Sequence, residues 1–165
     1  VMIVLGLTMG MQPIVGYNFG AQKIDRVKQT LKLGIVSGVV ITSSGFFICE
    51  LFPHAVSAIF TDSDHLIDLA VDGLRITVIM FPFVGAQIVI GNFFQSIGKA
   101  KISIFLSLTR QLLYLLPCLL LFPNWWGLKG IWISMPVSDA LAFITAVVSL
   151  IIYIKKVSKQ HPIAE

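Results

Sequence analysis

Five long apolar runs make up most of this chain of 165 residues, and they constrain its fold more than any other feature. Each run is close to or above the roughly 20 residues that a helix needs to cross a hydrocarbon core of about 30 Å. The runs lack the alternation that the strands of a membrane barrel show. The sequence therefore predicts an all-α integral membrane protein with about five transmembrane helices. The expected spans are residues 1–19, 27–52, 69–95, 102–122 and 128–154.

Composition agrees with this class. Hydrophobic residues make up 56% of the chain and charged residues only 12%, whereas soluble domains carry roughly 25% charged residues. The net charge of +4 forms no basic face with interleaved aromatic residues, so the expected partner is a lipid bilayer and not a nucleic acid. Cys49 and Cys118 lie in apolar runs and are predicted to be packing residues.

The charges of the connecting segments predict the topology. Basic residues gather in 20–26, in 96–101 and in the tail 155–165, whereas 53–68 carries Asp62, Asp64 and Asp68 and no Lys or Arg. The positive-inside rule places the basic segments in the cytoplasm. We expect a multi-pass protein of the inner or plasma membrane with a cytoplasmic C-terminus. A helix is expected after Asp62 or Asp64 as N-cap. The first apolar run has no initiating Met, so we expect this sequence to be part of a longer chain.

The end of the first run combines Gly and Pro with uncharged polar residues. A membrane helix tolerates such residues where neighbouring helices or a cavity satisfy the backbone groups left open. We interpret this stretch as a structural and hinge element; its residues are Gln12, Pro13, Gly16, Tyr17, Asn18 and Gly20. Three glycine pairs with four-residue spacing can bring helices close together, namely Gly6/Gly10, Gly16/Gly20 and, most strongly expected, Gly34/Gly38.

The third run carries three amide side chains, Gln87, Asn92 and Gln95, near one helical face that also holds Gly98. Such a face can line a cavity for varied solutes. The alternative is that these amides only hydrogen-bond between helices and hold the bundle together. Pro82 removes one backbone hydrogen bond and predicts a kink before Gln87.

Asp139 is the acidic residue placed well inside a span, on a face shared with Met135 and Phe143. An intramembrane carboxylate is protonated, paired or exposed to a cavity. Asp139 is therefore a candidate for drug binding and for proton or ion coupling. The alternative is local: if Pro136 breaks the helix, the carboxylate could cap the freed amides.

Two arginines complete the set of charges within the spans. Arg110 is expected to extend its guanidinium to the inner interface, about two helical turns from Asp139, so an ion pair between them is not predicted. Arg75 is expected to pair with Asp72, three residues away. There is no P-loop, GxSxG elbow, HExxH motif or metal-ligand cluster, so we predict a protein that is not an enzyme and has no metal site.

Three segments resemble one known family: Gln12–Ala21, Phe94–Lys101 and Trp132–Asp139. The chain resembles the C-terminal lobe of a multidrug and toxic compound extrusion (MATE) transporter. The resemblance implies a twelve-helix antiporter of two lobes, to which this chain contributes helices eight to twelve. The N-terminal lobe is then the missing partner, and helix seven of the C-terminal lobe is also missing. It also implies export of cationic or amphipathic small-molecule drugs in exchange for Na⁺ or H⁺, with no other cofactor. The chain departs from some members, because its third run has no deep carboxylate.

Two other functions remain open. A flippase for lipid-linked precursors on a related fold would need several basic residues in its cavity, and Arg110 is the deep cation of this chain. A membrane scaffold without transport activity would also fit the spans. The piece alone is not expected to transport, because alternating access needs two lobes.

Overall fold

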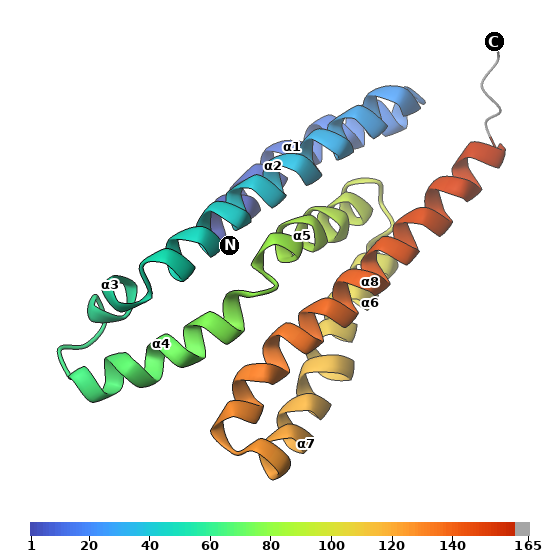
Figure 1. Cartoon of the computed structure of the whole chain (residues 1–165). Coiled ribbons are helices and arrows are strands. Elements are labelled where there is room, and N and C mark those ends of the chain that lie inside the picture. The colour runs from blue at the N-terminus through green and yellow to red at the C-terminus, as the bar shows by residue number, and fades with distance from the viewer. Residues whose placement is uncertain (161–165) are drawn as a thin grey trace.

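The computed structural model describes residues 1–160, and their regular structure is helical throughout, so the predicted all-α membrane fold is confirmed. Figure 1 shows the helices as a bundle with α5 between the α1–α2 pair and the α6–α8 pair. The bounds are α1 (Met2–Gly20), α2 (Ile24–Leu51), α3 (Pro53–Ala58), α4 (Asp64–Val78), α5 (Phe81–Ser96), α6 (Ala100–Leu108), the π-helical segment η1 (Thr109–Leu115), α7 (Leu116–Trp126) and α8 (Leu128–Gln160).

Four helical runs are long and apolar enough to cross a membrane, namely Met2–Gly20, Ile24–Leu51, Ala100–Trp126 and Leu128–Val157. A fifth span arises if α4 and α5 count as one bent helix. The helix expected after Asp62 or Asp64 is present as α4, which begins at Asp64. The predicted N-cap is wrong, because the N-cap is Ser63. The predicted tail lies only partly within the described residues, where α8 continues to Gln160.

The buried core lies around α5, because its side chains contact α1 and α2 on one side and α8 on the other. Phe94 of α5 is fully buried and packs edge-on against Tyr153 of α8, with ring centroids 5.5 Å apart. Val15 of α1 and Val89 of α5 are also fully buried. The two halves of the bundle are therefore joined through α5.

Glycines bring α2 and α5 into backbone contact. A Cβ at Gly38 would lie 3.1 Å from the carbonyl oxygen of Gly85, and a Cβ at Gly85 would collide with the carbonyl oxygen of Gly38. The Gly34/Gly38 pair therefore packs as the sequence predicts, since Gly34 faces Met11 and Val89. The other two pairs form no such interface in the described part of the chain: a Cβ meets nothing within 4 Å at Gly6, Gly10 or Gly20, and only Gly16 faces a neighbour, Ser96.

The two prolines expected to disturb helices behave differently. The chain bends by 51° between α4 and α5, immediately before Pro82. Pro82 has no N–H to donate to the carbonyl of Val78, and the amides of Phe83 and Val84 donate to Met80 instead. The break expected at Pro136 is wrong, because α8 continues through it. Neighbouring helices support such a proline in a membrane helix.

We predict that Gly85→Ala destabilises the protein, whereas Gly91→Ala on the same helix does not. The methyl group at Gly85 must push α2 away, a cost of about 1–3 kcal/mol for overpacking, but a Cβ at Gly91 meets nothing within 4 Å. Thermal unfolding in detergent measures the difference. Equal unfolding temperatures for the two variants would contradict the observed α2–α5 contact.

Candidate functional site

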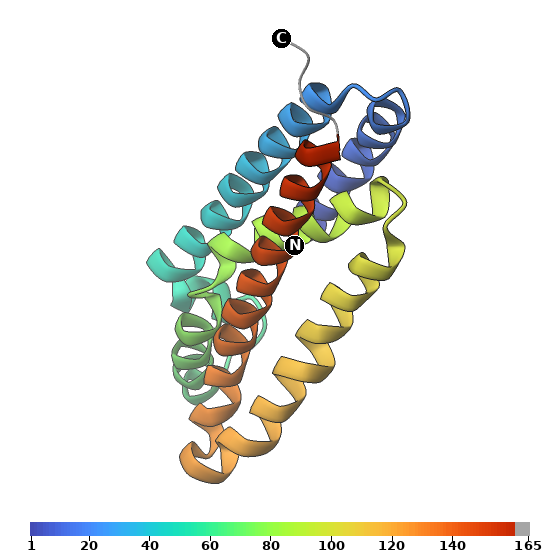
Figure 2. The same cartoon turned by 90° about the vertical axis from the view of Figure 1, so that its right-hand side faces the viewer.

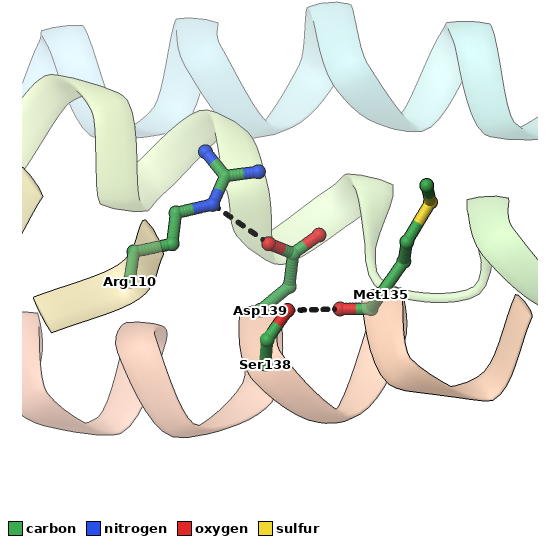
Figure 3. Close-up of polar contacts among 4 residues, drawn as sticks. All are labelled: Arg110, Met135, Ser138 and Asp139. Atoms are coloured by element: carbon green, nitrogen blue, oxygen red, sulfur yellow. Dashed lines mark hydrogen bonds and ion pairs between the residues drawn. The ribbon is translucent and has the colours of Figure 1, made fainter. Parts of the chain in front are cut away.

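A charged pair joins η1 to α8 within the bundle. Nε of Arg110 donates a hydrogen bond of 2.8 Å to Oδ1 of Asp139. Figure 3 shows the two side chains pointing toward each other from neighbouring helical runs. The side chain of Asp139 is 11% exposed and that of Arg110 is 37% exposed. The expectations that Arg110 turns to the interface and forms no ion pair with Asp139 are therefore wrong.

The reason is a matter of helix geometry and side-chain length. After the turn at Gly127, α8 runs back alongside α7, η1 and α6, as Figure 2 shows. Gly127 has a positive φ of 55°, a conformation that glycine adopts without strain. Counted from this turn, Asp139 is about five residues nearer than Arg110, or roughly 7.5 Å along the helix axis. The long arginine side chain spans that offset, so an axial separation of about two helical turns does not prevent the ion pair.

The carboxylate does not cap broken helix amides, the alternative that the sequence left open. Because α8 is continuous at Pro136, no group of amides is freed there. Two serine hydroxyls satisfy backbone carbonyls nearby: Ser134 donates to Gly130 at 2.7 Å and Ser138 donates to Met135 at 2.8 Å (Figure 3 shows the second). The partner of the Asp139 carboxylate among the described residues is Arg110.

The ion pair is formed through one atom on each side. Among residues 1–160, Oδ2 of Asp139 and the two Nη atoms of Arg110 have no protein hydrogen-bond partner. A pair bonded in this way neutralises the buried carboxylate, and it leaves an acceptor and several donors for another ligand. An exchange of cations at the Asp139 carboxylate stays a prediction.

A second contact between η1 and α8 lies four residues further along. Tyr114 and Thr145 are joined by a hydrogen bond of 2.8 Å. Because the Thr145 hydroxyl also donates to Leu141, Tyr114 is the donor of this bond. Single-turn π-helical segments are common at functional sites. Sequence reasoning predicted neither contact. Arg110 and Tyr114 are four residues apart, so their side chains are neighbours on a helix, and this spacing was the available signal.

The amides of the third run do not form one network. Gln87 is 9% exposed, and its Oε1 has no hydrogen-bond partner in the described chain. The side chain of Asn92 donates to the carbonyl of Ile88, and Gln95 is exposed. Their role in lining a cavity stays a prediction, in which Gln87 is distinguished by its buried free acceptor.

The apolar residues predicted beside Asp139 differ in their surroundings. Phe143 packs against Phe83 of α5, with ring centroids 5.2 Å apart. Met135 is 43% exposed. The ring of Trp132 covers Gly73 of α4. A wall for drug binding on this face stays a prediction.

At the end of α1, Asn18 is buried and donates to the carbonyl of Ile14 at 2.8 Å, which satisfies a backbone group near the helix end. Tyr17 is exposed, Gln12 is partly buried, and Pro13 lies within the continuous helix. Gly98 has a positive φ of 74° in the turn before α6. A hinge role for these positions stays a prediction.

The other charged contacts lie near the surface. The predicted Arg75–Asp72 pair is wrong: Nε of Arg75 lies 3.8 Å from Oε1 of Glu50, because the end of α2 passes beside α4. His54 and Asp68 are 3.8 Å apart and both exposed, so this pair contributes little stability. No group of His, Cys, Asp and Glu side chains in residues 1–160 could hold a metal ion.

Comparison with known proteins gives consistent matches. The MatE family model matches residues 1–120. The multidrug export protein MepA of Staphylococcus haemolyticus (strain JCSC1435) is 24% identical over 85% of this chain and 30% of its own length. MepA of Staphylococcus aureus (strain MSSA476) is 25% identical over 93% of this chain and 33% of its own length. The chain thus spans about a third of the curated relatives it matches.

Solved structures agree with the sequence matches. The MATE multidrug transporter DinF-BH, solved in complex with R6G, is 39% identical, with a TM-score of 0.84 over 89% of this chain and 33% of that one. An outward-facing multidrug resistance MATE transporter shares the fold, with a TM-score of 0.88 over 94% of this chain and 36% of that one at 20% identity. Because its family model covers most of the sequence, this chain belongs to the MatE family, the MATE multidrug efflux transporters.

Proposed function

We propose that this chain forms part of the C-terminal lobe, helices eight to twelve, of a two-lobe, twelve-helix secondary antiporter that exports cationic or amphipathic drugs in exchange for Na⁺ or H⁺. Membership of the MatE family supports transport, and the names of MepA and DinF-BH support drugs as substrates. The observation that carries the proposal is the Arg110–Asp139 pair, which places an exchangeable charge within the bundle.

The physical basis is the cost of a buried charge. A carboxylate that has left bulk water needs a positive partner, and removing that partner is strongly unfavourable. Arg110 supplies the positive charge in the observed state. A cationic drug, a Na⁺ ion or a proton can replace it, and each occupancy excludes the others. Competition for one carboxylate makes binding of drug and coupling ion mutually exclusive, which is what antiport requires.

We propose that the basic ends of the helices face the cytoplasm of a plasma membrane and that the C-terminus is cytoplasmic. Lys and Arg cluster at the turns between α1 and α2 and between α5 and α6, and after Ile154, while the turn after α3 is acidic. Two lobes of this kind can rock against each other and expose Asp139 to alternate sides.

The flippase alternative is less favoured by the same site. A phosphate-bearing lipid precursor calls for several cations in its cavity, whereas the polar contacts around Asp139 include one cation, Arg110, among the described residues. That cation is already balanced by a carboxylate. A scaffold without transport activity would leave the pair unexplained.

We predict that Asp139→Asn in the full-length transporter lowers export of a fluorescent cationic dye from cells more than Arg110→Gln does. The expected loss is roughly tenfold or more, which corresponds to about 1.4 kcal/mol, because the amide cannot exchange cations. Asp72→Asn is the matched control: it removes the same charge from an exposed position on α4. Normal export by Asp139→Asn, or an equal loss in the control, would remove Asp139 from the mechanism.

We also predict that Asp139→Asn and Arg110→Gln are not additive in stability. Each single change leaves one charge without its partner, whereas the double change removes both charges. The coupling energy should be about 0.5–3 kcal/mol, the range for residues in contact. Thermal unfolding of wild type, both single variants and the double variant gives this value. Additive effects would mean that the pair contributes nothing.

A further inference from the structure

A groove lies between the end of α1, the start of α6 and the end of α8, away from the Arg110–Asp139 pair. Its volume is about 910 Å³. Three lysines, Lys99, Lys101 and Lys156, line it together with the apolar side chains of Ile102, Phe105 and Ile152. On α8, Lys156 is about 17 residues from Asp139, or roughly 25 Å along the axis. The groove is therefore separate from the ion-pair site.

The described part of the chain does not balance the positive charge of this groove. Its lining contains no Asp or Glu. The ion pairs of the described chain involve other residues, so none of the three lysines is neutralised by a neighbour in residues 1–160. Like charges held together without a counter-ion attract an anion.

The apolar wall distinguishes between kinds of anion. Phe105 and Ile152 are 53% and 62% exposed on two runs long enough to cross a membrane. Each lies about one helical turn from a lysine of the groove, Lys101 or Lys156. A free inorganic anion gains nothing from such a wall, whereas a phospholipid presents a charged phosphate above long apolar chains. A cavity of several hundred Å³ also suits a small molecule of lipid headgroup size better than a single ion.

We propose that this groove binds one anionic phospholipid, with its phosphate among Lys99, Lys101 and Lys156 and its acyl chains against Ile102, Phe105 and Ile152. Basic pockets between membrane helices are suited to anionic headgroups of the cytoplasmic leaflet. The proposal does not depend on which drug or coupling ion the transporter uses.

The test is lipid binding to the purified full-length transporter, measured by native mass spectrometry with phosphatidylglycerol and phosphatidylcholine. Wild type should retain phosphatidylglycerol at least tenfold better than phosphatidylcholine. The variant Lys99→Gln/Lys101→Gln should lose most of this preference, and Lys156→Gln should lose part of it. The control variant, Arg26→Gln/Lys32→Gln, removes the same charge near the same end of the bundle but outside the groove, and it should bind as wild type does.

A competition arm separates a lipid site from a site for free anions. Millimolar inorganic phosphate should not displace phosphatidylglycerol from wild type. Three results would overturn the proposal: equal retention of both lipids, equal binding by the groove variant and the control variant, or displacement by inorganic phosphate. The second of these is also the outcome expected if another part of the chain fills the groove.

Discussion

Asp139 needs a positive partner, because its side chain lies inside a helical bundle where water is scarce. Arg110 meets this need, and the resulting bond ties η1 to α8. Tyr114 and Thr145 add a neutral bond between the same elements. The wall of the bundle formed by α6, η1 and α7 thus contacts α8 through two polar side-chain bonds in addition to its apolar packing. Such contacts suit a transporter that changes between two arrangements.

The other side of the bundle is built for rigidity. Gly38 and Gly85 bring α2 and α5 into backbone contact, and Phe94 fills the space between α5 and α8. The bend before Pro82 divides this span into a peripheral helix, α4, and a central one, α5. A rigid half faces a wall held by exchangeable polar bonds, which explains why the candidate site lies on η1 and α8.

Several features follow from the sequence by simple physics. Apolar runs of sufficient length predict the spans, and Gly34 and Gly38 predict the contact of α2 with α5. The wrong predictions for the partners of Arg75 and Arg110 share one cause. The partners of Arg75 and Arg110 depend on how far helices are offset and how far a long side chain reaches, and neither quantity is local in sequence. Pro136 fails for a related reason, since packing around α8 decides whether a proline breaks a membrane helix.

In the proposed mechanism, the carboxylate of Asp139 exchanges Arg110 for a transported cation. The most direct test is a structure of the full-length transporter with a cationic drug bound. We expect the drug's positive group to lie at hydrogen-bond distance from Asp139 and the guanidinium of Arg110 to have moved out of contact with Asp139. A bound drug with the Arg110–Asp139 bond still at 2.8 Å would contradict it.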